Sequence, residues 1–293
     1  MLRFQRNGTC SSARSNPKFT TVLTEKSCEL RVRGTSALVE NRMSRPTHVY
    51  IVVSPRPRTG RTLLARALTE FYRTDGRPVG AFDLDTFDGM LAQFLPSFTV
   101  RADIADTRGQ VALFDELIIA NEKPKVVDVS AHAYEPFFAV MEQIGFAAEA
   151  PLQAVDPVIL FATNADAQSA KAYARLRERF PGLTLTPVYN DGIVRGHSLR
   201  NDFPATSAIA LPLRIPTLSP ALRAIVDAPP FSFSEFRRRP DMREPLGGEL
   251  NSWLKRVYLQ FREMELRLLL SNLRGSLKTS PPEPPLDEAR PPA

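Results

Sequence analysis

Positive charge gathers in one short segment of this chain. The segment VYIVVSPRPRTGRTLLARAL, residues 49–68, places Arg56, Arg58 and Arg61 between an apolar run and a helical pattern of apolar residues. Guanidinium groups this close together repel one another unless an anion lies among them. The spacing therefore predicts an anion site, and phosphate oxygens are acceptors that a guanidinium can clamp.

The order of elements around these arginines is that of a phosphate-binding loop. Val49–Val53 is a short β-branched run, typical of a strand buried on both faces, and a helical pattern begins at Gly60-Arg61-Thr62. The loop amides and the helix N-terminus would make a concave positive site for the phosphates of a nucleotide. The Thr62 hydroxyl suits a magnesium ligand. The Walker A pattern G-x-x-x-x-G-K-[ST] asks for Gly at position 55 and Lys at 61, where this chain has Pro55 and Arg61.

Three carboxylates follow other apolar runs of the sequence. Asp83 and Asp85 lie in AFDLDTFD, and Asp128 ends the apolar run KVVDVS in the manner of a Walker B acid. If these runs are parallel strands, their carboxyl ends lie on the same edge of the sheet as the loop. The alternative is that all three carboxylates are ordinary caps at strand ends.

Strands and helices alternate from about residue 47 to residue 215. The predicted strands are Val49–Val53, Pro78–Leu84, Lys125–Val129, Pro157–Ala162 and Leu183–Tyr189, with a sixth at Ala208–Leu213. The predicted helices are a first one from Gly60 to Asp75-Gly76 and three more at Thr107–Ala120, Pro136–Ile144 and Asp166–Phe180. Such alternation predicts an α/β fold of right-handed βαβ units around a mostly parallel, doubly wound sheet.

The two ends of the chain have a different character. We expect a basic mobile arm over residues 1–44, a domain over 45–228, a helical extension over 229–276 and a Pro-rich disordered tail over 277–293. Apolar residues at 250, 254, 257, 261, 264 and 268 step along one long helix, which either packs on the domain or forms a partner seam. Met43 is an alternative start of the chain.

Charge and composition narrow the function classes. Residues 1–46 hold nine of the 38 Lys/Arg residues but three of the 32 Asp/Glu residues, so the rest of the chain carries no net charge. If the protein binds nucleic acid or an anionic membrane surface, we therefore expect it to do so only through the basic arm. Two cysteines and three scattered histidines argue against a disulfide framework and a zinc site. No apolar run is long enough for a membrane helix, and we expect a cytoplasmic protein.

On these residues the sequence resembles the deviant-Walker P-loop ATPases of the ParA/MinD type, within the SIMIBI class. The family loop, roughly K-G-G-x-G-K-[ST], falls on residues 56–62. Arg56 then takes the place of the signature lysine that reaches the partner subunit's nucleotide, and Arg61 takes that of the Walker lysine. Pro57 and Arg58 replace glycines. The D-x-D of the family falls on Asp83-Leu84-Asp85 and its Walker B acid on Asp128.

The resemblance implies a P-loop NTPase-like fold and a set of roles. Arg61 and Asp85 would be catalytic, with Asp85 orienting the attacking water. ATP would be held by Arg56, Arg58, Thr59, Gly60, Arg61, Thr62 and Leu63, and Mg²⁺ by Thr62, Asp128 and Asp83. Asn190, after the fifth strand, would flank the base, or else belong to a simple turn.

The implied function is a nucleotide-binding switch, with ATP hydrolysis as an open question. ATP binding would close a homodimer, and the dimer would act on a protein partner that the sequence does not identify. Two alternatives remain: a non-hydrolysing scaffold that keeps the fold, and a small-molecule kinase with residues 190–204 as its lid.

Overall fold

The apolar strand that precedes the arginine-rich loop lies in the middle of the sheet. A computed structural model describes residues 45–194, 202–238 and 245–279 of the chain. The strand, β1 (Thr47–Val53), is buried along its whole length because β-branched and aromatic residues fill both of its faces. It pairs in parallel with β4 (Lys125–Val129) and with β5 (Val155–Ala162), which agrees with the expected parallel sheet.

The sheet has seven strands in the order β3-β2-β4-β1-β5-β6-β7, and every pairing in the described residues is parallel. The remaining strands are β2 (Gly80–Asp83), β3 (Thr99–Arg101), β6 (Thr184–Asn190) and β7 (Leu213–Ile215). Parallel strands present all their carboxyl ends on one edge. The α/β class with a mostly parallel, doubly wound sheet is thereby confirmed.

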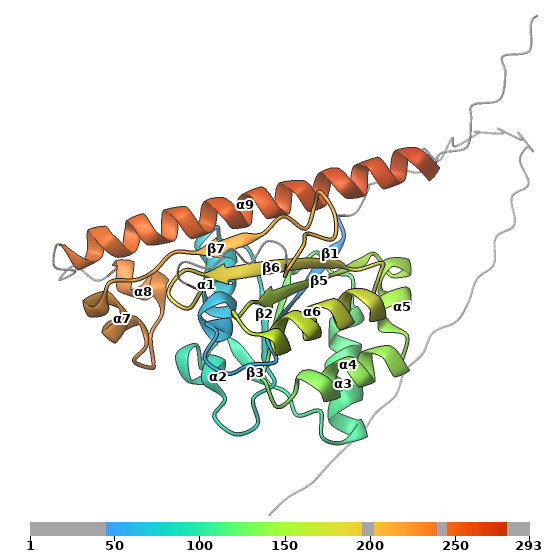
Figure 1. Cartoon of the computed structure of the whole chain (residues 1–293), viewed down its shortest axis with the longest axis horizontal. Coiled ribbons are helices and arrows are strands. Elements are labelled where there is room, and N and C mark those ends of the chain that lie inside the picture. Colours follow the sequence, from blue (N-terminus) through green and yellow to red (C-terminus); the bar gives the residue numbers. More distant parts are fainter. Residues whose placement is uncertain (1–44, 195–201, 239–244, 280–293) are drawn as a thin grey trace, which may run out of the picture. The chain divides into compact units, whose positions relative to one another are not determined.

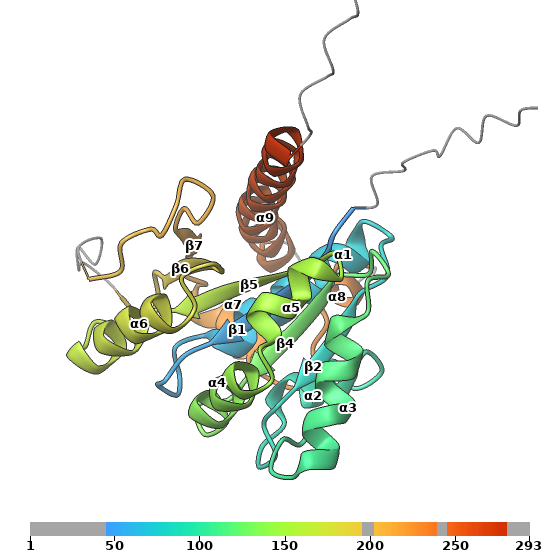
Figure 2. The ribbon, with the colours of Figure 1, turned by 90° about the vertical axis from the view of Figure 1, so that its right-hand side faces the viewer.

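Helices cover both faces of the sheet, and each face has its own apolar core (Figures 1 and 2). One face carries α3 (Thr107–Ile118), α4 (Tyr134–Gln143), α5 (Phe146–Leu152) and α6 (Ala167–Arg179). The other carries α1 (Arg61–Thr74), α2 (Met90–Phe94), α7 (Pro220–Val226), α8 (Phe233–Arg238) and α9 (Leu246–Thr279).

Some elements differ from the sequence prediction. The sixth predicted strand, Ala208–Leu213, is wrong: β7 begins at Leu213, because Pro212 has no N–H to give to a ladder. The short elements α2, β3, α5, α7 and α8 were not predicted, since three to seven residues hold too few periods of a pattern. Gly145, with φ +66°, separates the unpredicted α5 from α4, which corresponds to the predicted helix Pro136–Ile144.

The long C-terminal helix α9 packs on the chain's own domain. Its six regularly spaced apolar residues, from Leu250 to Leu268, are buried against β7, α1 and α7. Trp253, beside this row, donates from Nε1 to the Pro216 carbonyl at 2.7 Å and stacks on Phe233. The packing follows the first of the two interpretations of this helix.

Several predicted segments lie outside the described residues. They are the basic arm 1–44, most of the lid region at 195–201, and the tail from residue 280. Within the described ranges, no helix combines the length and apolarity that crossing a membrane requires.

The packing of α9 predicts a large contribution to stability. Phe261→Ala removes a fully buried ring that contacts Phe71, and should lower the free energy of unfolding by about 3–5 kcal/mol. Leu259→Ala, on the exposed side of the same helix, is the matched control and should change it by less than about 0.5 kcal/mol. The measurement is denaturant unfolding followed by far-UV circular dichroism and by the fluorescence of Trp253, the single tryptophan. Equal effects of the two substitutions, or separate transitions for the two probes, would contradict the packing.

Candidate functional site

The candidate site lies at the carboxyl edge of the sheet, where neighbouring strands send their helices to opposite faces. β1 leads into α1 on one face, whereas its neighbour β4 leads into α4 on the other. Connections that diverge in this way leave a crevice in α/β sheets. The crevice here is a cavity of about 790 Å³.

The predicted phosphate loop forms one wall of this cavity. Eight consecutive residues, Arg56–Leu63, line it. The facing walls come from the ends of other strands: Asp85 after β2, residues 130–132 after β4, and Asn190 at the end of β6. The structure thus brings the loop together with one acid of the D-x-D segment and with the end of the strand that carries Asp128.

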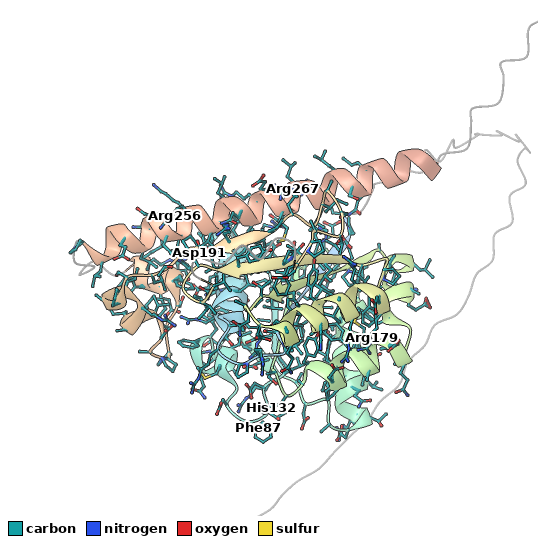
Figure 3. The ribbon with its side chains drawn as sticks, viewed as in Figure 1. Phe87, His132, Arg179, Asp191, Arg256 and Arg267 are labelled. Carbon is teal, nitrogen blue, oxygen red and sulfur yellow. The ribbon has the colours of Figure 1, made fainter. Side chains whose placement is uncertain are left out.

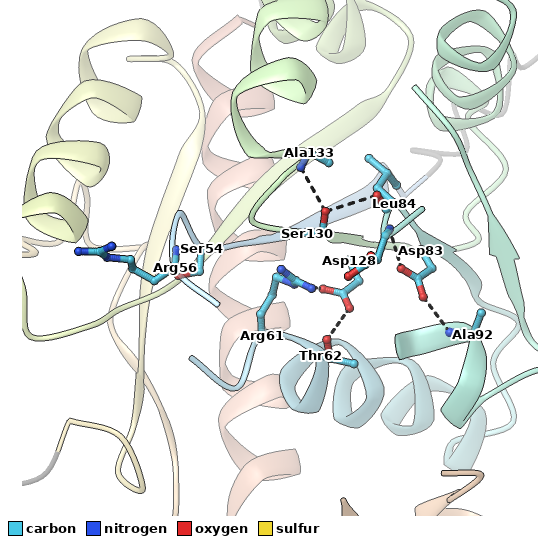
Figure 4. Close-up of polar contacts among 11 residues, drawn as sticks. Ser54, Arg56, Arg61, Thr62, Asp83, Leu84, Ala92, Asp128, Ser130 and Ala133 are labelled. Atoms are coloured by element: carbon cyan, nitrogen blue, oxygen red, sulfur yellow. Dashed lines mark hydrogen bonds and ion pairs between the residues drawn. The ribbon is translucent and has the colours of Figure 1, made fainter. Parts of the chain in front are cut away.

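Asp128 is joined directly to the first turn of α1 (Figure 4). The Thr62 hydroxyl donates to Asp128 Oδ2 at 2.8 Å, and Arg61 Nε forms an ion pair with Asp128 Oδ1. The carboxylate is fully buried and the Arg61 side chain is 11% exposed. A buried charge requires a partner, so this pair fixes the Arg61 guanidinium at the floor of the loop.

Gly60 connects the loop to α1 in a conformation that favours glycine. Its φ is +83°, and a Cβ atom there would lie 2.1 Å from Asn190 Nδ2. The Asn190 amide is itself held, since it donates to the Thr59 carbonyl at 3.4 Å and accepts from the Gly192 N–H at 3.0 Å. Asn190 therefore supports the loop from β6, and it also begins the turn over residues 191–193, as the second of the two sequence interpretations expects.

The Thr59 side chain has an unused hydrogen-bonding group. Thr59 is 2% exposed and lines the cavity, yet its hydroxyl has no partner among the described residues. Buried hydroxyl groups are ordinarily hydrogen-bonded. The adjacent N-terminus of α1 also lacks a side-chain cap, whereas Asp166 caps α6. Donors without partners therefore collect at this end of the cavity, where an anion would satisfy them.

The two acids of the D-x-D segment take different positions. Asp83 is buried beside Asp128 in the paired strands, and its two oxygens accept from the amides of Asp85 and Ala92 at 2.9 Å each. Burial raises the pKa of this carboxyl, and the neighbouring Asp128 acts in the same direction. Asp83 anchors α2 and does not line the cavity. Asp85 does line it, with Oδ1 accepting from the amides of residues 87 and 88.

The remaining loop arginines line the cavity but do not bond Asp128. Arg56 Nε pairs with Asp166 Oδ2 at 3.3 Å, away from the Asp128 cluster (Figure 4). Arg58 is exposed, makes no ion pair within the described part of the chain, and has φ +59°. Two of the three crowded guanidiniums thus have carboxylate partners, so self-repulsion is a weaker argument for an anion than the sequence suggested.

Sequence reasoning missed Arg66, a buried residue in the cavity wall. Its Nη2 donates to the carbonyls of Val226 and Phe231 at 2.9 and 3.3 Å, and its guanidinium lies 3.5 Å from the Phe94 ring centroid. Burial lowers its pKa to about 10, against the opposing effect of Glu70 and Asp227. The available signal was an arginine among the apolar residues 64–68 of an amphipathic helix. Phe87 and His132, which contact each other at the cavity mouth, were also not assigned (Figure 3).

The all-parallel sheet with helices on both faces has a Rossmann/P-loop-like α/β fold. In sequence comparisons, no known family model and no curated protein matches this chain. The class therefore rests on the strand order and on the loop geometry.

The oxygen atoms around Asp128 do not suit the magnesium ion that the resemblance implies. Mg²⁺ demands octahedral oxygen ligands at about 2.0–2.1 Å. Asp128 Oδ1 carries the Arg61 guanidinium, and both Asp83 oxygens hold backbone amides. Among the residues that the structure describes, no three His, Cys, Asp or Glu side chains are grouped to share a metal. A divalent ion at Asp128 would also be repelled by the adjacent guanidinium.

The close approach of Asn190 to the loop predicts a strong effect of a Cβ at position 60. Gly60→Ala adds left-handed strain and overpacking, and should lower the free energy of unfolding by about 2–4 kcal/mol. Gly76→Ala is the control: its φ is +70° but no atom lies within 4 Å, so the cost should be about 1–2 kcal/mol. Thermal or denaturant unfolding measures both. In an Asn190→Ala background the excess cost at position 60 should shrink, and an unchanged excess would contradict the contact.

Proposed function

We propose that this chain is a nucleotide-binding P-loop protein of the ParA/MinD type, which holds the phosphates of ATP in the loop Arg56–Leu63. The observation that carries the proposal is that all eight of these residues line one cavity at the switch point of a parallel sheet. The cavity is within the range of about 300–1,000 Å³ of small-molecule sites.

The binding geometry follows from the donors at the loop. The uncapped amides of the first turn of α1 and the positive end of its dipole would meet phosphate oxygens. Arg61 would contribute charge-assisted hydrogen bonds, and the Thr59 hydroxyl would gain an acceptor that it lacks in the protein alone. These groups are already held in place, so little ordering entropy opposes binding.

The geometry supports binding without turnover better than hydrolysis. In the resemblance, Arg61 would follow the transferred phosphate and Asp85 would orient water. Arg61 is instead committed to Asp128, and removing one partner of a buried pair costs about 3–5 kcal/mol. We therefore place the protein with the non-hydrolysing relatives, in which nucleotide regulates contact with a partner. Dimerisation through Arg56 is not part of this proposal, because Arg56 pairs with Asp166 of its own chain.

The first test is ligand-linked stability. ATP at 100 times its dissociation constant should stabilise the full chain by about 2.7 kcal/mol, which corresponds to a rise in melting temperature of about 5–10 °C. Phosphate release, measured in the same samples, should stay at the background rate. The absence of any thermal shift with ATP would remove the proposed function, and turnover would favour the hydrolysing reading.

The unpartnered hydroxyl gives a sharper test. Thr59→Val removes no protein hydrogen bond, so the free protein should keep its stability, while the affinity for ATP should fall about 10- to 100-fold through loss of a bond to a charged oxygen. Thr186→Val is the matched control, since Thr186 also has a buried hydroxyl without a partner in the described chain but does not line the cavity. Isothermal titration calorimetry measures both affinities. Equal affinities for the two variants would place the phosphates elsewhere.

A further inference from the structure

We infer that this site binds its phosphate ligand without a divalent cation, because the Arg61 guanidinium held by Asp128 supplies the positive charge at the position where a metal would sit. The inference rests on the proposed function, and it concerns the same cavity. It assigns to Arg61 the role of a built-in cation that decides metal dependence.

The first step is the occupancy of Asp128. One of its oxygens carries Arg61 Nε and the other accepts the Thr62 hydroxyl, so each oxygen already has a donor from the protein, and one of these donors is a cation. The carboxylate is fully buried, and leaving it without a cation would be strongly unfavourable. Arg61 therefore stays on Asp128 when ligand arrives, and a divalent ion would have to enter beside a guanidinium that repels it.

The second step is the donor capacity of Arg61. A guanidinium has five N–H groups in a rigid planar fork. The ion pair uses Nε, and in the described residues neither terminal nitrogen hydrogen-bonds another residue. Arg61 lines the cavity beside the unpartnered Thr59 hydroxyl and the uncapped end of α1. The fork can therefore reach phosphate oxygens while Asp128 fixes its orientation.

The third step is the contrast with lysine. An ammonium is a compact point charge on a flexible stem, and its three N–H groups all lie on a single nitrogen, so it cannot bind Asp128 through one nitrogen and phosphate through others as a guanidinium can. A lysine that moved to the ligand would release Asp128 Oδ1, on the same carboxylate whose Oδ2 accepts from the Thr62 hydroxyl at 2.8 Å, and that oxygen and the hydroxyl are both ligands that a metal can use. The presence of arginine at position 61 would therefore make phosphate binding independent of a metal ion.

The experiment titrates ATP and ADP into the full chain by calorimetry, once in EDTA and once in excess Mg²⁺, with Mg²⁺ alone as a further titrant. The expected result is nucleotide affinity in EDTA within about threefold of that in Mg²⁺, and no heat from Mg²⁺ alone. Arg61→Lys should bind at least about 10-fold more weakly in EDTA, with Mg²⁺ restoring the affinity. Arg256→Lys, at an exposed position of α9 that does not line the cavity, is the matched control and should show no dependence on Mg²⁺.

The outcomes separate the two proposals. Wild-type affinity that rises about 10-fold or more with Mg²⁺ overturns metal independence and leaves nucleotide binding intact. No binding in either buffer overturns both. Circular dichroism and the Trp253 fluorescence confirm that each variant is folded. If Arg61→Lys does not fold, Thr62→Val serves instead, because it removes the hydroxyl that a metal would need. Since the inference places no metal there, the affinity of this variant for nucleotide should fall equally in the two buffers. A larger fall in Mg²⁺ would contradict the inference.

Discussion

The fully buried carboxylate of Asp128 determines how the loop after β1 is attached to the sheet. Asp128 lies in the centre of the sheet beside Asp83, and neither charge can reach water. Buried charges persist only where donors surround them. Backbone amides donate to Asp83. Arg61 and Thr62, which follow the neighbouring strand β1, donate to Asp128. The first turn of α1 is thereby attached to β4, and this attachment fixes the end of the loop.

The loop is held at three points, and its middle is left open to the cavity. The pair of Arg56 with Asp166 fixes its beginning, and Asp128 fixes its end. Asn190 supports it from β6 where Gly60 leaves room. Between these points Thr59 keeps a hydroxyl without a partner in the described chain. A scaffold that fixes the surroundings of unpaired donors is preorganised for an acceptor, which is how rigid α/β sheets commonly build ligand sites.

The sequence predicts this architecture to the extent that it depends on buried strands. β1, β4 and β5 each contain a short run of apolar residues and are buried almost throughout, so the parallel sheet and the shared edge of the loop and the acids can be predicted from them. The pattern of apolar residues does not indicate which charged side chains form ion pairs. It could not show that Arg61 bonds Asp128 or that Arg56 bonds Asp166, because the partners are far apart in the sequence. The first pair is separated by 67 positions and the second by 110. Arg66 was missed for the same reason: its carbonyl partners lie more than 150 positions away.

The arginine that takes the place of the Walker lysine affects both the ligand-binding charge and the carboxylate of Asp128. A buried ion pair is a weak source of stability, because desolvation offsets much of its attraction. The pair of Arg61 with Asp128 therefore contributes orientation more than free energy of folding. A guanidinium held through Nε keeps its terminal nitrogens in a defined plane, and the same bond occupies the carboxylate that a metal would need. On our proposal, arginine in the place of the Walker lysine changes both the charge that meets the ligand and the cation that the site admits, and the loop would then act as a metal-free anion receptor and not as a damaged catalytic motif.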